Sequence, residues 1–538
     1  MDLLYLLVLL AFATNTAEGI DDSGMTNEYV FTVPTLGPTI IYNRDVDGGI
    51  IYFSPHVFIT TPSRDPVNVT LCIPSLNNAS YHTIDRDHHV DITLPFEFRL
   101  NLGDGKQNVT GIIRSSGMVA VHVIDTGFIE SDIFTVYSSS RLGNVYYVAT
   151  YTPQTSFFCV SALYPDTVVS VKKTLQENNI FHLKQYESYR FDGSNGEDLS
   201  GTRIESNKPV AVIAGGETAI GENAWVGNSD GALEQLPPVS SWGHTYVLAP
   251  FLLSDLGYFF RVYAGTMLTT LSISDNDTVT ILPEDFYEGT SNEVLTLLSD
   301  QPVMVSQYIT GAGSQHFESM IIIPPATSYT SNVTFSVFMH DGTISDLLEY
   351  FINVVMECIY IDGLLLDNQE TVWDDQLSSD FDDMCCIRKG VNTGEHYVEH
   401  ANPNAQFFVY VYGICRGRCA SSYVYPASDV YFRKETNGLT TLPTSTEETT
   451  GLTTLPPSTE ETNELTTLPT STEETNGLTL TTLPTNKGKG HCCSIARNFL
   501  EGRAGRLVSS VVVVVVVRED VYRASNCPHP IGFATVVK

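Results

Sequence analysis

The densest group of side chains able to bind a metal ion or exchange protons lies early in the chain. It consists of Asp85, Asp87, His88, His89 and Asp91. Imidazole and carboxylate groups are common metal ligands, but neighbouring residues of a strand point to opposite faces, so the two histidines cannot easily share one ion. The segment therefore favours a solvated turn that leads into the strand VDITLPF.

A second group is a run of aspartates that could hold calcium through oxygen ligands. Its members are Asp374, Asp375, Asp380, Asp382 and Asp383. Their spacing does not match an EF-hand, so an exposed acidic loop is the favoured interpretation. The sequence also lacks His-Glu-x-x-His, Gly-x-Ser-x-Gly and Walker motifs. We therefore predict no catalytic residue, no metal and no cofactor, although 62 acidic residues leave a glycan hydrolase with paired carboxylates open as an alternative.

Composition points to a folded, acidic protein. The 538 residues include 28 Lys and Arg against 62 Asp and Glu, a formal charge of −34, and 42% are hydrophobic. This hydrophobic fraction suffices for a large core and excludes a wholly disordered chain. The acidity disfavours binding to nucleic acid or to anionic lipid, both of which need a basic surface.

The first 19 residues are typical of a secretory signal peptide. Their apolar run 3–13 is too short to span a bilayer, and Ala17 and Gly19 are small residues suited to cleavage before Ile20. No later segment is long enough for a transmembrane helix, since the best, 507–517, is short and contains two serines. We expect a secreted, extracellular protein.

An exported chain with ten cysteines is expected to form disulfides, and Cys415 and Cys419 are close enough in sequence for a local bridge. Export would also make the Asn-x-Ser/Thr sequons candidate N-glycosylation sites. They lie at Asn68, Asn78, Asn108, Asn276 and Asn332.

The elements that would position any site are short β-strands. Apolar or alternating runs such as 119–124, 210–215, 303–309 and 408–413 are separated by Gly, Asn, Asp and Pro, with no long helical periodicity. Three elements recur in one order: a Val-rich strand, a turn-and-aromatic element (142–151, 242–251 and 324–337) and an aromatic strand (157–163, 259–265 and 350–356). The segment 20–435 is therefore predicted to contain tandem β repeats of roughly 95 residues, about three and a half copies, each sandwich-like or propeller-like.

Two different segments follow this all-β region. Residues 436–486 repeat a 13-residue unit and contain 20 Thr, three Ser and five Pro, a composition typical of a disordered, mucin-like, O-glycosylated stalk. Residues 487–538 are basic and include seven consecutive valines at 511–517. We predict that this tail is unstructured.

The repeats resemble the N-terminal domain of the IgG Fc-binding protein family. The similar motifs are LPP-x3-WG-x2-Y at 236–246, GEHYVEH at 394–400, FFVYVYG at 407–413 and SYVYPAS at 422–428. Cys415, Cys419 and Ala427 depart from the family's ending, and its von Willebrand type D modules are absent, which argues against a gel-forming role. The resemblance implies a β-rich, extracellular binding or adhesion module, but it defines no site residues to transfer.

Two Gly- and Asn-rich loops are the best candidates for recognition. The loop at 221–231 contains Asn223 and Trp225, and the equivalent loop at 310–319 contains His316. Loops on a rigid β scaffold often carry binding residues, and tryptophan is frequent in binding hot spots. Trp242 and Trp373 occupy repeat-like positions and are expected in the core.

The leading hypothesis is therefore a secreted, glycosylated, non-enzymatic binding or adhesion protein of mucus, extracellular matrix or innate immunity. Its partners would be extracellular proteins or glycans, such as mucins, matrix proteins or immune proteins. The alternatives are the glycan hydrolase and a cell-surface adhesion protein whose membrane anchor is missing from this sequence.

Overall fold

The computed structural model describes one region of the chain. It covers residues 24–36 and 54–432 with gaps at 102, 127–130, 152–155, 174–177, 195–196, 217–231, 253–256, 275–276, 311–317, 339–347, 380–381 and 416–421. The chain divides into two compact units, Met1–Thr444 and Ser445–Lys538, and all described residues belong to the first. The predicted signal peptide, the predicted stalk and the basic tail lie outside the described residues.

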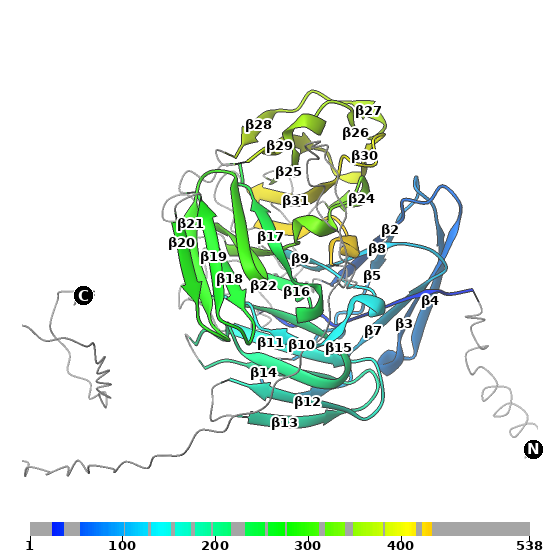
Figure 1. The fold of residues 1–538 in the computed structure, drawn as a ribbon. Coiled ribbons are helices and arrows are strands. Elements are labelled where there is room, and N and C mark those ends of the chain that lie inside the picture. The colour runs from blue at the N-terminus through cyan, green and yellow to red at the C-terminus, as the bar shows by residue number, and fades with distance from the viewer. Residues whose placement is uncertain are drawn as a thin grey trace, which may run out of the picture. The chain divides into compact units, whose positions relative to one another are not determined.

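The described residues form β-strands joined by turns and short 3-10 helices, which confirms the all-β prediction (Figure 1). The first repeat contains β1 (Asn27–Phe31), β2 (His56–Thr60), β3 (Val67–Ile73), η1 (Pro74–Leu76), β4 (Asn78–Ile84), β5 (Val90–Thr93), β7 (Gly111–Ser115), β8 (Ala120–Thr126) and β9 (Ser131–Thr135). The strand β6 (Gly105–Gln107) lies between β5 and β7 in the sequence but pairs with a strand of the second repeat, β14. The second contains η2 (Ser139–Arg141), β10 (Gly143–Tyr147), β11 (Ser156–Ala162), β12 (Thr167–Lys172), β13 (Asn178–Leu183), β14 (Ser188–Asp192), β15 (Arg203–Gly216) and β16 (Ala232–Gln235).

The other two repeats follow the same order. The third contains η3 (Val239–Ser241), β17 (Gly243–Leu248), β18 (Tyr258–Ala264), β19 (Thr269–Ser274), β20 (Asp277–Ile281), β21 (Phe286–Ser291), β22 (Leu295–Thr310) and β23 (Glu318–Ile323). The fourth contains η4 (Ala326–Ser328), β24 (Asn332–Val337), β25 (Leu348–Glu357), η6 (Cys358–Tyr360), β26 (Leu364–Leu366), β27 (Gln369–Glu370), β28 (Asp375–Ser378), β29 (Met384–Val391), β30 (Gly394–His400), β31 (Phe407–Cys415), β32 (Ser422–Pro426) and η7 (Asp429–Tyr431).

All four repeats share one antiparallel pairing scheme. In the first, one sheet has the order β1-β7-β3-β4 and the other β5-β2-β8-β9; in the fourth, the matching sheets are β24-β30-β26-β27 and β28-β29-β25-β31-β32. In the second and third repeats, one long strand replaces the pair β7 and β8, so β15 and β22 each join both halves. Four complete copies are therefore present, rather than the three and a half expected from the sequence.

The burial of each strand follows from its place in this scheme. The outer strand β12 alternates, with Val169 and Val171 buried and the residues between them partly exposed, as expected for a sheet with one covered face. In contrast, every residue of β11 and β18 is buried. These strands are covered on both faces because neighbouring repeats pack against them, which explains their continuous apolar sequences.

The final strands of the four repeats meet one another. β9 contacts β16, β16 contacts β23, β23 contacts β32, and β32 contacts β9 again. This closed cycle of edge strands is the arrangement of a four-bladed, propeller-like ring, and it protects the inner edge of each sheet from solvent and from other chains.

Neighbouring repeats are joined by contacts that recur. The Gly143 and Gly243 positions press against the proline that begins the next 3-10 turn: an added Cβ would lie 2.5 Å from Pro238 Cβ and 2.4 Å from Pro325 Cβ, respectively. Only a residue without a side chain fits such an approach. The WG motif at 242–243 therefore reflects packing between repeats.

Buried arginines add a second recurring contact. Arg190, Arg261 and Arg388 each donate to a backbone carbonyl of the preceding repeat: Thr35 O at 2.7 Å, Thr150 O at 2.9 Å and Pro250 O at 2.6 Å. All three side chains are 6% exposed or less. Because a buried guanidinium needs partners for its donors, these bonds fix the spacing of consecutive repeats.

Two acidic side chains, Asp132 on β9 and Glu234 on β16, are fully buried among the inner strands. Burial raises the pKa of both carboxyl groups well above their usual values, and in Glu234 the charge of Asp132 adds to the effect. Neither Glu234 carboxyl oxygen has a hydrogen-bond partner among the residues that the structure describes. Glu234 therefore destabilises the folded chain wherever it must ionise.

Replacing Glu234 with Gln is expected to stabilise the folded protein at pH 7–8 by roughly 1–3 kcal/mol, because the amide keeps the size of the side chain without a charge. A carboxyl group with a raised folded-state pKa is neutral in both the folded and the unfolded chain below its unfolded pKa, and it costs stability only as pH rises above that value. The gain from Glu234→Gln should therefore vanish near pH 4. Thermal unfolding at both pH values measures this. Glu293→Gln, at an exposed position, is the control, and an equal gain at pH 4 would contradict the ionisation argument.

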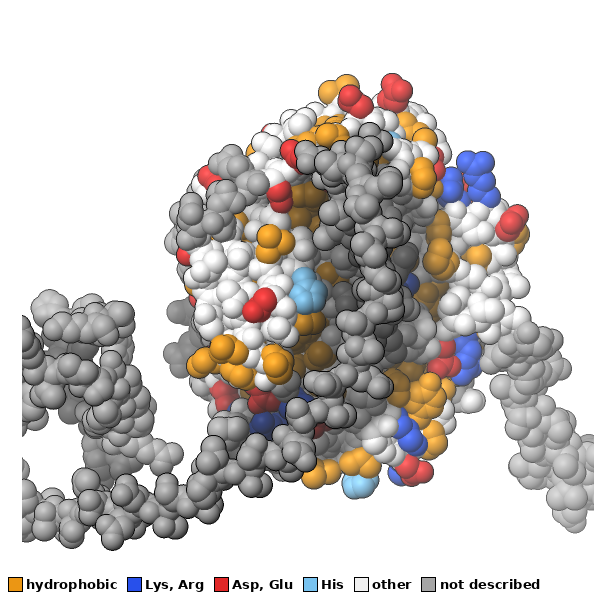
Figure 2. Space-filling model, viewed as in Figure 1, with side chains coloured by type: hydrophobic (Ala, Val, Ile, Leu, Met, Phe, Trp, Pro, Cys, Tyr) orange, Lys and Arg blue, Asp and Glu red, His pale blue; other side chains and the backbone are white. Residues whose placement is uncertain are grey.

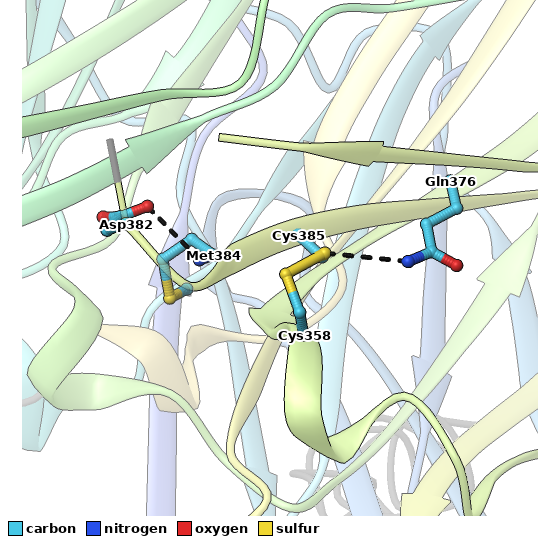
Figure 3. Close-up of a disulfide and its surroundings, with 5 residues drawn as sticks. All are labelled: Cys358, Gln376, Asp382, Met384 and Cys385. Carbon is cyan, nitrogen blue, oxygen red and sulfur yellow. Dashed lines mark hydrogen bonds between the residues drawn. A yellow bond between two sulfur atoms is a disulfide. The ribbon is translucent and has the colours of Figure 1, made fainter. Parts of the chain in front are cut away.

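A disulfide joins Cys358 to Cys385 in the fourth repeat (Figure 3). It connects the 3-10 turn after β25 to β29, and the side chain of Gln376 lies 3.9 Å from the Cys385 sulfur. The sequence did not predict this pairing. The predicted bridge between Cys415 and Cys419 stays a prediction, because Cys419 lies outside the described residues.

Candidate binding site between the second and third repeats

The side chains predicted for recognition fall outside the described part of the chain; these are Asn223, Trp225 and His316. The strands beside them are known: one loop joins β15 to β16 and the other joins β22 to β23, and both pairs end at the inner strands of the ring. Trp242 is 2% exposed, which confirms its expected place in the core, and Trp373 is partly buried against the same core.

The two groups examined for metal binding have protein partners. His88 bonds Asp85 within the turn at 2.7 Å, whereas His89 reaches Glu395 of the fourth repeat at 2.8 Å. Asp374 pairs with Lys389 at 2.6 Å and Asp375 with Arg388 at 3.0 Å. Part of the acidic run is strand β28 rather than the loop expected from the sequence.

The four sequon asparagines in the described part of the chain, Asn68, Asn78, Asn108 and Asn332, are all exposed. Exposure is what a bulky glycan requires, but glycosylation itself stays a prediction. Asn276 lies outside the described residues.

A pocket of about 570 Å³ lies at the junction of the second and third repeats. Its walls come from β10 and β15 of the second repeat and from η3 and the turn Gly265–Thr266 of the third. The volume falls within the range of small-ligand sites, which are roughly 300–1,000 Å³. Small residues, Gly143 on one wall and Ser240 and Gly265 on the other, contribute to its lining.

Charges beside the pocket are paired across the junction. Glu284 of the third repeat accepts from Lys172 and from Arg203 of the second, each at 2.8 Å, and Arg203 also pairs with Glu205. The hydrogen bond from Lys172, together with Arg203, lowers the pKa of Glu284. Arg203 Nε is buried without a hydrogen-bond partner among the described residues, and the Tyr147 hydroxyl lies beside the Glu284 carboxylate. The site thus offers hydrogen bonding without a strong net charge.

An apolar rim borders the same pocket. Met267, Leu268 and Leu282 are 60%, 56% and 60% exposed. Met267 and Leu268 directly follow the turn that lines the pocket, and the pairing of Thr269 with Ile281 brings Leu282 beside Leu268. Figure 2 shows hydrophobic side chains gathered near basic and acidic ones on the face in view. Exposed apolar groups beside a polar pocket are a feature of surfaces that bind other molecules.

Sequence reasoning missed this junction. Tyr147 and Glu284 come from segments far apart in the sequence, and Glu284 belongs to no motif. The nearest signal was the recurring turn-and-aromatic element, which contains Tyr147 in one copy and Trp242 in the next; these rings pack 5.5 Å apart across the junction.

The comparisons with known proteins agree with the motifs. The family of IgGFc binding protein matches residues 132–413, more than half of the chain. The chain belongs to the IgGFc-binding family. No curated protein and no solved structure matches it.

Membership of the IgGFc-binding family points to an extracellular binding protein. The match begins at β9, so β1–β8 lie before it, although the first repeat has the same strand pairing as the other three. The junction pocket lies within the matched range. Among the described residues, no helix has the length and apolar character needed to cross a membrane.

Proposed function

We propose that this protein is a secreted, glycosylated, non-enzymatic binding or adhesion protein of mucus, extracellular matrix or innate immunity. Membership of the IgGFc-binding family is the observation that carries the proposal. The signal-like segment 1–19, the exposed sequons and the Thr-rich stalk support export and display of the repeats away from a surface. The partners are extracellular proteins, immunoglobulin among them, or the glycans of mucins and matrix.

Within this proposal, the partner binds at the junction of the second and third repeats. The pocket supplies a concave surface with hydrogen-bonding groups, and Met267, Leu268 and Leu282 supply apolar contact area. The loops with Trp225 and His316 form a second predicted surface, tested separately by Trp225→Ala and His316→Ala.

Binding of the full chain, expressed through the secretory pathway, to immunoglobulin Fc, purified mucin and a glycan array tests the function. We expect saturable binding to at least one, and Ser240→Trp, which fills the pocket, should weaken it at least tenfold. Thr327→Trp is the matched control, because Thr327 is exposed at the same place in η4 and does not line the pocket. Equal binding by both variants would contradict the site, and product release from a polysaccharide would contradict a non-enzymatic role.

A further inference from the structure

The ring closes where the fourth repeat meets the first, and one histidine is buried in this contact. We call this contact the seam and define it by β2, β8 and β9 on one side and by β32 and Phe338 on the other. His122 lies on β8, opposite Phe58 on β2 and Thr135 on β9. Its ring centre is 4.8 Å from that of Tyr425 and 6.1 Å from that of Phe338.

The surroundings of His122 are suited only to a neutral ring. The side chain is 0% exposed, and the polar groups closest to its ring are uncharged backbone carbonyls. Burial lowers the pKa of His122 to about 4, although the nearby carbonyls of Pro426 and Ala427 act in the opposite direction. A protonated imidazole here would be a buried cation without a counter-ion, which is strongly unfavourable.

Other titratable groups near the seam do not provide that counter-ion. Tyr425 of β32 is buried, and burial raises the pKa of its hydroxyl well above the usual value, so it stays neutral. Asp125 and Asp132 lie on β8 and β9 at positions that alternate to the opposite face from His122. Beyond Phe58, the side chains of His56 and Asp91 bond each other at 3.0 Å.

One ion pair between the fourth and first repeats, His89 with Glu395, should respond to acid in the opposite direction from His122. His89 of the first repeat bonds Glu395 on β30 at 2.8 Å, and this hydrogen bond raises the pKa of His89. Acid therefore strengthens the pair. Its two side chains are 38% and 18% exposed, so water screens the interaction, whereas His122 is fully enclosed. The buried group should dominate the response below pH 6.

We propose that the seam between the fourth and first repeats is an acid-sensitive latch, closed while His122 is neutral and opened when its imidazole takes up a proton. Opening separates β9 from β32 and exposes the ring nitrogens to water. The protonated ring then no longer bears the cost of burial. A ring that opens at one seam can change its binding surface without unfolding each repeat. This property does not depend on the identity of the partner.

Hydrogen exchange of the full chain at pH 7.5 and 5.0, corrected for intrinsic rates, tests the latch. A closed-state pKa of about 4 against an ordinary value near 6.5 implies that the opening constant rises roughly 15- to 30-fold over this interval. We expect that rise in peptides from β8, β9 and β32 but not in β12 and β19. Equal change in all five strands, or none at the seam, would overturn the proposal.

His122→Phe and His122→Gln separate protonation from packing. Both variants remove the titrating group, one retaining an aromatic ring and the other a polar side chain, so either one that folds should lose the pH-dependent opening. His182→Gln, an exposed histidine of β13, should behave like the unmodified protein. A His122 variant that still opens at pH 5.0 to the same degree would overturn the assignment of the trigger.

Discussion

Asp429→Ala is expected to lower the free energy of unfolding by about 3–5 kcal/mol, the cost typical of removing one partner from a buried ion pair. Asp429 is 3% exposed and joins the end of the fourth repeat to the start of the second: its Oδ2 accepts from Ser138 N at 2.9 Å and from Arg141 Nε at 2.8 Å. Without the carboxylate, the Arg141 charge and the Ser138 amide lose their partner. Urea unfolding of the full chain measures the loss.

The expected loss of stability in Asp429→Ala depends on the burial of the ion pair and not simply on its charge. Glu205→Ala removes a carboxylate that is 49% exposed from its pair with Arg203, and we expect a cost of about 1 kcal/mol or less. A double variant, Asp429→Ala with Arg141→Ala, should recover part of the stability because no unpaired cation remains. If Asp429→Ala costs no more than Glu205→Ala, the proposed role of Asp429 in closing the ring is wrong.

Arg261→Met is expected to produce a loss of similar size, about 3–5 kcal/mol, at the junction of the second and third repeats. Arg261 donates to Thr150 O at 2.9 Å and pairs with Asp198 at 2.7 Å and with Glu288 at 2.8 Å. Methionine retains apolar volume but removes every one of these contacts. Two carboxylates then lose their counter-charge. Thermal and urea unfolding measure the change, with Arg64→Met at an exposed position as control.

The same variant should alter the acid dependence of stability. Burial alone would raise the pKa of Asp198, but Arg261 and the Ser200 hydrogen bonds lower it below the usual value. A carboxyl with a lowered pKa stabilises the fold above its unfolded pKa, near 4, and loses that effect as pH falls through the folded pKa. Arg261→Met should therefore lose less stability than the unmodified protein between pH 5 and pH 2. An unchanged slope would contradict the Asp198 pairing.

Local sequence patterns were sufficient to predict the strands. Runs such as 119–124 and 210–215 lie in β8 and β15, because alternating or continuous apolar residues have few other stable conformations. The presence of repeats could also be predicted from the sequence, although the number of copies could not. The recurring aromatic element was recognised after only three of the four central strands. Only the central strand of the first repeat, at 119–124, was recognised, because strands β1–β5 share the pairing of the other copies but not their motifs.

The candidate site was not predictable in the same way. Glu284 contacts Lys172 and Arg203, which are 112 and 81 residues away, and none of the three belongs to a motif. The acidic and histidine groups that stood out in the sequence instead form local pairs or contacts between repeats. Residue type and spacing along the chain do not report which side chains a junction brings together.

The sequence by itself determined the class of the protein: an acidic chain of tandem β repeats in the IgGFc-binding family, with a Thr-rich segment after it. Strand formation and repeat similarity are local properties, so they can be read from neighbouring residues. Only the tertiary structure decided that the repeats form a closed ring, that a pocket lies between two of them, and that His122 and Asp429 lie at the closure. The physical reason is distance along the chain: Thr135 Oγ1 donates to Pro426 O at 2.6 Å across 291 residues.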